Sequence, residues 1–284
     1  IGNWLGKLAH LDEFDHHVMI MCGMSAAFAA VFGTPMAAAV FAMEVVSVGV
    51  MYYAALLPCV IASIIAAEFA TGMGIDPETF PVHSIPGLTV ETGLKMALIA
   101  VGCGILSILF CILLKTVGQL YTKYLKNPYI RIVVAAGVII LLTICLNTKD
   151  YMGAGSGLIA RAIEKGEARP LDFLWKMLLT ALTMRAGYRG GEIVPAFSIG
   201  ATFGCVAGGI LGFSPELAAA ASMVALFCGV TNCPITAMLI SFELFGFSGA
   251  AYYLIAISIS YAVSGYYSLY KDQTIVYSLS LIHI

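Results

Sequence analysis

The sequence predicts an all-α integral membrane protein, and three observations lead to this fold class. Of the 284 residues, 61% are hydrophobic and only 11% are charged, whereas soluble domains carry about 25% charged residues. The mean hydropathy is +0.96, and uncharged runs long enough to cross or re-enter a bilayer follow one another along the chain. The third observation is an internal repeat, which predicts two halves of related structure.

The uncharged runs indicate where helices lie in the membrane. They cover residues 18–43, 45–67, 96–114, 132–146, 193–215, 217–242 and 244–270. Several contain glycine or proline, at Gly33–Pro35, Pro58, Gly229 and Pro234. Such interruptions predict short, broken helices, as in transporters whose substrate site lies near the middle of the membrane. Residues 115–131 are basic and carry no acid, which predicts a cytoplasmic position.

Composition and motifs argue against several other classes of protein. The net charge of −2 and the lack of a basic stripe exclude a nucleic-acid partner. The eight cysteines form no C-x-x-C pair, so we expect no metal and no cofactor. The polar stretch 12–17 is interpreted as an N-capping linker, because adjacent side chains of a helix do not converge on a metal. Residues 153–157 are glycine-rich but lack a preceding strand and a following Lys-Ser pair, which predicts a helix connector.

Residues 187–204 hold the candidate functional site. Gly190 and Gly191 permit backbone conformations closed to other residues, and Pro195 suits the first turn of a helix. A helix that begins there presents unpaired N–H groups and the positive end of its dipole, which suits an anion. Glu192 stands at this helix start inside an apolar run, where a carboxylate is costly. The alternative is an ordinary turn with an acid that favours the helix dipole.

The internal repeat pairs two proline-containing segments. Thr34-Pro35 is followed by Glu44, and Cys233-Pro234 is followed by Glu243, with nine residues from proline to glutamate in both and an offset of 199 between them. We expect each glutamate to accept hydrogen bonds near a helix end. The alternative is a direct place in proton transfer.

The repeat also predicts how the chain is divided. Residues 1–71 are the remainder of a first inverted repeat, 72–90 an extracellular loop, 91–268 the second repeat, and 269–284 the start of a C-terminal helix. At this offset, roughly 100 residues of the first repeat precede residue 1, including the first copy of the anion-facing turn. We therefore expect the sequence to be a piece of a longer transporter.

These motifs together resemble the CLC family of chloride channels and proton-coupled anion antiporters. The family's G-x-F-x-P turn, whose backbone amides hold the central anion, resembles residues 191–195. Its two proline-to-glutamate segments resemble residues 32–45 and 232–243, and the tyrosine that helps close the central site falls on Tyr277. The resemblance implies an inverted-repeat, CLC-type bundle of tilted and broken helices. It also implies an anion site formed by Gly191, Glu192, Ile193, Val194 and Tyr277.

Two departures from the family pattern favour one branch of it. Glu192 replaces an apolar residue, and Val45 stands where the chloride antiporters have an internal proton-handling glutamate. Both resemble the bacterial fluoride/proton antiporters. Fluoride is strongly hydrated, so stripping its water requires strong hydrogen-bond donors, and a protonated Glu192 is one. The resemblance thus implies fluoride export in exchange for protons, with Glu192 in proton coupling and selectivity.

The alternatives are a chloride channel or a chloride/proton antiporter of the same fold. An intramembrane enzyme is a remote alternative, because the histidines lie in polar or terminal segments and leave the buried acids without a partner. We expect no enzyme, a multi-pass protein of the plasma membrane, and a homodimer. The glycine-containing runs 96–114 and 244–270 are candidates for the dimer interface. The partners are fluoride or chloride, protons and the lipid bilayer.

Overall fold

A computed structural model gives the fold, and it describes residues 2–75, 77, 79–270 and 273–276. The first part contains α1 (Gly2–Leu8), α2 (Glu13–Phe32), α3 (Pro35–Glu44), β1 (Ser47–Val48), η1 (Tyr53–Ala55) and α4 (Leu56–Gly72). The second contains α5 (Val90–Tyr124), α6 (Pro128–Leu146), α7 (Ser156–Glu164), α8 (Asp172–Ala186), α9 (Ile193–Ile210), α10 (Pro215–Thr231), α11 (Pro234–Phe245), α12 (Ala250–Ser264) and β2 (Thr274–Ile275). The prediction of an all-α membrane protein is confirmed.

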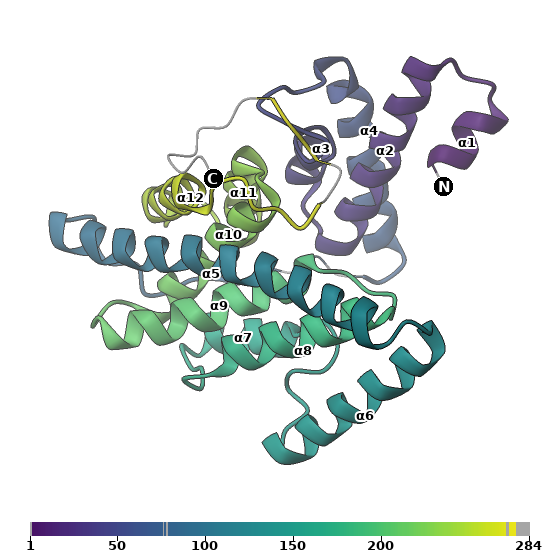
Figure 1. Ribbon diagram of the computed structural model, residues 1–284. Coiled ribbons are helices and arrows are strands. Elements are labelled where there is room, and N and C mark those ends of the chain that lie inside the picture. Colours follow the sequence, from purple (N-terminus) through teal and green to yellow (C-terminus); the bar gives the residue numbers. More distant parts are fainter. Residues whose placement is uncertain (1, 76, 78, 271–272, 277–284) are drawn as a thin grey trace.

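The long helix α5 runs through the middle of the molecule, between two groups of helices (Figure 1). Helices α10, α11 and α12 lie on one side of it, and α7, α8 and α9 lie on the other. Helices α2, α3 and α4 form a group beside α11, and α6 projects away from the rest. Within the described residues, five helical segments are long and apolar enough to cross a membrane: 13–32, 53–72, 90–124, 128–146 and 193–210. The other apolar helices are shorter, as the interrupted runs predicted.

The two broken helix pairs, α2–α3 and α10–α11, share one backbone geometry. Gly33 and Asn232 end the first helix of each pair in the left-handed region, at φ 68° and 57°. The next residues, Thr34 and Cys233, have φ −118° and −117°, both with ψ 74°. A proline then begins the second helix, where its missing N–H leaves no bond unmade. The repeat predicted for these two segments is confirmed at this local level, whereas the boundaries of the two halves stay a prediction.

Two details differ from the sequence interpretation. Gly229 does not interrupt a helix, because α10 continues to Thr231. This glycine instead allows a close approach, since a Cβ there would lie 2.6 Å from Ser107 Oγ on α5. The polar stretch 12–17 is not a separate linker, because α2 begins at Glu13. Its capping role is confirmed, with the Asp12 side chain accepting a hydrogen bond from Asp15 N at 2.8 Å.

Glu44 and Glu243 connect the two pairs reciprocally. The Glu44 carboxylate accepts hydrogen bonds from Ile235 N at 3.0 Å and Thr236 N at 2.8 Å, at the start of α11. The Glu243 carboxylate accepts bonds from Met36 N and Ala37 N, both at 2.9 Å, at the start of α3. Each acid thus satisfies the free amides and positive dipole end of the opposite short helix. This geometry agrees with the structural role predicted for both residues.

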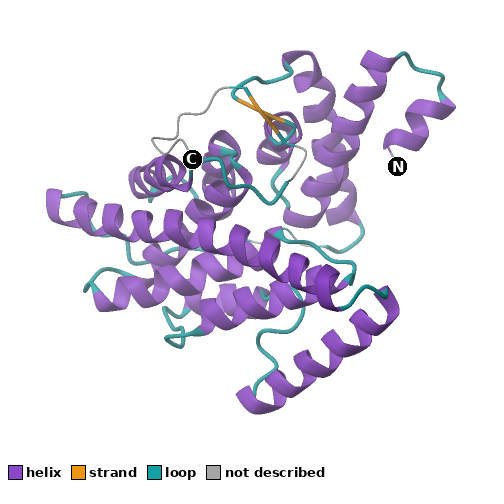
Figure 2. Cartoon of the chain, in the orientation of Figure 1, coloured by secondary structure: helices purple, strands orange, loops and turns teal. Residues whose placement is uncertain are grey.

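A short strand pair completes the connection between the two groups of helices. β1 and β2 run parallel, with Ser47 opposite Thr274 and Val48 opposite Ile275 (Figure 2). Just before β2, the Gln273 amide donates to Val45 O at 3.0 Å and to Thr231 O at 2.8 Å. One side chain therefore links the end of α3, the end of α10 and the segment that leads toward the C-terminus.

Candidate anion site at the start of helix α9

The site is built on the turn between α8 and α9. Helix α8 ends at Gly187, whose φ of 112° suits a residue without a Cβ. The chain then runs through Gly190 and Gly191 to Glu192, which caps α9. The first hydrogen bond of α9 in this turn runs from Ala196 N to Glu192 O at 3.1 Å. The amides of residues 192–194 precede it and take no part in the helical ladder, so they remain open to an acceptor.

Glu192 is paired with a cation that the sequence analysis did not assign to the site. Its Oε1 lies 3.2 Å from Nη2 of Arg185, which is in the last turn of α8. The side chains of Glu192 and Arg185 are only 19% and 26% exposed. The pair offsets the cost of placing either charge in an apolar part of the molecule, since an unpaired charge there is expensive. Glu192 is thus held at the start of α9 by an ion pair.

Both members of this ion pair face one cavity of about 800 Å³, which we term the Glu192 cavity. It is also lined by Val45 and Gln273, and its remaining lining residues are Met24, Ala27, Phe28, Phe41, Val46, Leu269 and Tyr270. Helices α2 and α3 therefore contribute an apolar wall, and the α8–α9 turn contributes the charges. Val45 lies in the same cavity as Glu192, at the position where the family resemblance places the proton-handling glutamate.

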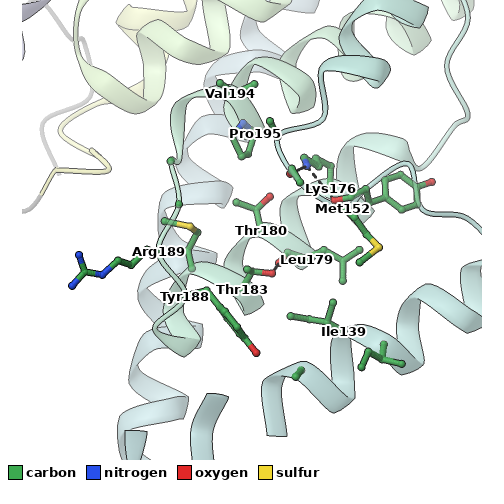
Figure 3. Close-up of a pocket in the computed structure, with 18 residues that line it drawn as sticks. Ile139, Met152, Lys176, Leu179, Thr180, Thr183, Tyr188, Arg189, Val194 and Pro195 are labelled. Atoms are coloured by element: carbon green, nitrogen blue, oxygen red, sulfur yellow. Dashed lines mark hydrogen bonds between the residues drawn. The ribbon is translucent and has the colours of Figure 1, made fainter. Parts of the chain in front are cut away.

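A second cavity, of about 570 Å³, lies against the same turn and is termed the Lys176 cavity. Gly191 and Val194 line it, together with α6, α8 and the connector before α7. In Figure 3, Lys176 and Thr180 face this cavity, whereas Arg189 points away from it. Lys176 is 1% exposed and donates to Tyr151 O at 3.1 Å and Gly153 O at 2.7 Å. A buried ammonium group thus stands beside the start of α9.

A third cavity, of about 640 Å³, shares Arg185, Tyr270 and Gln273 with the Glu192 cavity. We term it the Arg131 cavity. Its charged lining residues are Lys115, Arg131 and Arg185, and no Asp or Glu is among the residues that line it. Arg131 is fixed by a hydrogen bond from Nε to Ala186 O at 2.9 Å. This cavity therefore has a positively charged lining, and Arg185 lines both it and the Glu192 cavity.

The predicted site residues of this turn do not all face the same cavity. Glu192 lines one cavity, while Gly191 and Val194 line the other. Ile193 is half-buried and packs against the core. Tyr277 lies outside the described residues, so its predicted place at the anion stays a prediction. Nothing in the described part of the chain groups three or more His, Cys, Asp or Glu side chains as a metal site would require.

Sequence reasoning missed Arg185, Lys176 and Gln273. Arg185 and Lys176 are basic residues on one 15-residue helix, and Lys176 stands between apolar residues of α8. A cation among apolar residues near an expected anion site is a usable signal. Gln273 gave no such signal, because its importance comes from contacts with residues more than 40 positions away.

The fold and site together define a helical membrane protein with two proline-broken helix pairs and a charged helix start between cavities. Residues 1–265 match the family model described as "Voltage gated chloride channel". The chain therefore belongs to this family, the CLC family, whose members are channels and transporters. Anion transport across a membrane is the activity shared by the relatives described next.

Two curated relatives are similar to this chain over most of its length. A chloride/fluoride channel protein of Pseudomonas syringae pv. tomato is 32% identical over 98% of this chain and 63% of that protein. The H(+)/Cl(-) exchange transporter ClcA of Vibrio cholerae is 27% identical over 86% of this chain and 55% of that protein. The chain thus spans somewhat less than two thirds of the length of these relatives.

Solved structures agree with this family membership. The crystal structure of a CLC-type fluoride/proton antiporter superposes with a TM-score of 0.91 at 32% identity, covering 95% of this chain and 68% of that one. A slow cyanobacterial Cl-/H+ antiporter superposes with a TM-score of 0.72 at 17% identity, covering 93% of this chain and 64% of that one. The second likeness concerns the fold alone.

Proposed function

We propose that the protein to which this chain belongs exports fluoride in exchange for protons. The observation that carries the proposal is Glu192, a carboxylate at the start of α9, paired with Arg185 and facing a cavity. The 32% identical relative is named a chloride/fluoride channel protein, and the structure with the TM-score of 0.91 is a fluoride/proton antiporter. The antiporter structure supports fluoride as the anion, and the name of the relative is compatible with fluoride or chloride.

The chemistry of the turn fits a small, strongly hydrated anion. The amides of residues 192–194 can donate hydrogen bonds, and the N-terminal dipole of α9 favours negative charge. A protonated Glu192 adds an O–H donor, whereas an ionised Glu192 repels the anion. Hydrogen bonds to an ionised acceptor are short and strong, as the loss of fluoride's hydration shell requires. Proton and anion occupancy are therefore linked at Glu192.

The two cavities on either side of the turn support a path for the anion past α9. The Glu192 cavity and the Lys176 cavity both reach residues 190–195, and each presents a basic side chain. The anion moves from one to the other along the amides at the helix start.

The experiment that tests the function uses the protein from its complete reading frame in liposomes. Vesicles are loaded with fluoride or chloride, and anion efflux and external pH are recorded together. Fluoride efflux with proton uptake, and little efflux of chloride, is the expected result. Chloride efflux as fast as that of fluoride would instead indicate a chloride/proton antiporter like the V. cholerae relative. Fluoride efflux without proton movement would indicate a channel.

Replacing Glu192 by Gln tests its role in coupling. Gln keeps the shape but cannot exchange a proton, so the number of protons moved per fluoride is expected to fall at least about tenfold. The same assay measures it. The control is Glu164→Gln, an exposed acid at the end of α7 that lines none of the three cavities. A Glu192→Gln variant that still moves protons in fixed ratio to fluoride would remove Glu192 from the coupling.

The plasma membrane is the proposed location, and the protein is proposed to work as a homodimer. Helix α5 supports an interface within 96–114, because Leu98, Ile105 and Leu109 are 59%, 50% and 48% exposed. Within 244–270, seven of the 15 residues of α12 are buried, and among its large apolar residues Leu254 is exposed, at 37%. The α5 face is therefore the better candidate. Cross-linking of single cysteines placed on each face in native membranes tests the choice.

A further inference from the structure

We propose that Arg185 is a specificity and positioning residue at which the transported anion competes with the Glu192 carboxylate. Binding of the anion to the Arg185 guanidinium releases the carboxylate, which then takes up a proton. This inference rests on the proposed function and adds the residue through which anion binding and protonation are linked.

The guanidinium of Arg185 is paired with Glu192 but does not use all of its N–H donors. Nη2 contacts Glu192 Oε1 at 3.2 Å. Nε is buried and has no hydrogen-bond partner in the described part of the chain. The aliphatic part of the side chain lies against α5, since a Cβ at Gly118 would be 3.5 Å from Arg185 Cδ. A guanidinium has five N–H donors in a fixed plane. Because the Arg185 side chain is 26% exposed and lines both cavities, an anion in either cavity can compete with Glu192 for it, and a small shift that opens the unpaired Nε–H adds a donor.

The position of Arg185 between two cavities gives an anion access to it. The Arg185 side chain lines both the Glu192 cavity and the Arg131 cavity. Lys115 and Arg131 line the latter, which has no acidic lining residue, so the local potential attracts anions toward Arg185. An anion that arrives from this side meets the guanidinium before it reaches the amides at the start of α9.

The surroundings leave Glu192 as the group that responds to the anion. The other charged or titratable groups that line these two cavities or contact α8 beside the pair are Cys111, Lys115, Tyr121, Arg131, Tyr266, Tyr267 and Tyr270. Among the described residues that line the two cavities, Glu192 alone carries a carboxylate. The walls contributed by α2 and α3 are apolar. When the anion occupies the guanidinium, Glu192 loses its counter-ion, and its charge is removed by a proton from the water of the cavity.

The competition predicts a measurable link between fluoride affinity and pH. The purified protein from the complete reading frame is titrated with sodium fluoride by calorimetry from pH 6 to pH 8, in two buffers of different ionisation enthalpy. The wild type is expected to take up protons as it binds fluoride. Its affinity is expected to fall as pH rises, by at most about tenfold per pH unit, the limit for one linked proton.

Three variants separate the roles of the two side chains. Arg185→Gln is expected to lower fluoride affinity at pH 6 at least tenfold and to abolish both the pH dependence and the proton uptake. Arg185→Lys keeps the charge and is expected to retain the pH dependence with weaker binding. Glu192→Gln is expected to bind fluoride with no pH dependence. Lys126→Gln, an exposed residue that lines none of the three cavities, removes the same charge and is expected to behave as wild type.

Two results would overturn the inference in different ways. If Arg185→Gln binds fluoride with the wild-type affinity, or weakly but with the wild-type pH dependence, the competition does not occur at Arg185, and the proposed function stands. If the wild type binds neither fluoride nor chloride, the proposed function fails and the inference fails with it. A folded Arg185→Gln sample is confirmed by its elution volume, and Arg185→Lys provides the second reading of the pH dependence.

Discussion

The two broken helix pairs have the same backbone turn in different surroundings. In α10 every residue from Leu217 to Thr231 is buried, whereas in α2 only five of 20 residues are. Glu44 is 5% exposed and accepts three hydrogen bonds, including one from Thr236 Oγ1 at 2.6 Å. Glu243 is half-buried and accepts two. Local sequence therefore sets the shape of the break, and tertiary packing sets how much each capping acid contributes to stability.

The largest difference in stability between the two pairs is expected when Glu44 and Glu243 are replaced. Glu44→Ala leaves two backbone amides and a hydroxyl without an acceptor in a buried place, at a cost of about 3 kcal/mol or more. Glu243→Ala leaves two amides that water can reach more easily, at a cost of about 1 kcal/mol. Unfolding in mixed detergent micelles, followed by circular dichroism against denaturant, measures both.

The matching Glu→Gln variants serve as controls, because Gln keeps one acceptor oxygen and should lose less stability at either position. Equal destabilisation by Glu44→Ala and Glu243→Ala would show that burial does not distinguish the two caps. That result would contradict the comparison.

A smaller effect is expected where the two pairs are joined. Gln273→Leu removes the bonds to Val45 O and Thr231 O, one at each pair, and leaves Thr231 O with only the weak Cys233 S–H donor. The expected loss is about 2 kcal/mol in the same unfolding measurement. Ser268→Ala is the control, because it removes the 2.8 Å bond to Gln273 Oε1 and the 3.1 Å bond from Tyr270 N but leaves both bonds that the Gln273 amide donates to the two pairs. If Ser268→Ala costs as much as Gln273→Leu, the link between the pairs is not what Gln273 contributes.

The sequence predicted those parts of the structure that depend on local chemistry. Gly33–Pro35 and Pro234 predicted the two breaks, and the two glycines before Glu192 predicted the start of α9. The partners of Glu44 and Gln273 could not be predicted, because they come from distant segments. Arg185 is seven residues from Glu192, yet only the turn at Gly187 brings the two side chains together. Gly229 was misread because a helix interior can need a glycine for close packing as well as for a break.

The smallest losses of stability are expected at Gly33 and Asn232, the left-handed residues of the two turns. They compare the two turns most directly. Gly33→Ala places a Cβ at φ 68°, which costs about 1 kcal/mol. It also brings that Cβ to 2.8 Å from Pro77 Cα, so the loop at Pro77 must shift. Asn232→Gly relieves the left-handed strain but loses the 3.2 Å bond from Nδ2 to Tyr267 O, and the two terms nearly cancel to within about 0.5 kcal/mol.

The same unfolding measurement distinguishes the two substitutions, and Gly33→Asn is the informative control. Asparagine tolerates the left-handed conformation, as Asn232 does in the second pair. Any destabilisation by Gly33→Asn therefore reports the contact with Pro77 and not the backbone angle. If Gly33→Asn is as stable as the wild type while Gly33→Ala is not, the turn alone explains the glycine. If both lose stability equally, the first pair needs glycine because of its contact with Pro77, which the shape of the turn alone does not predict.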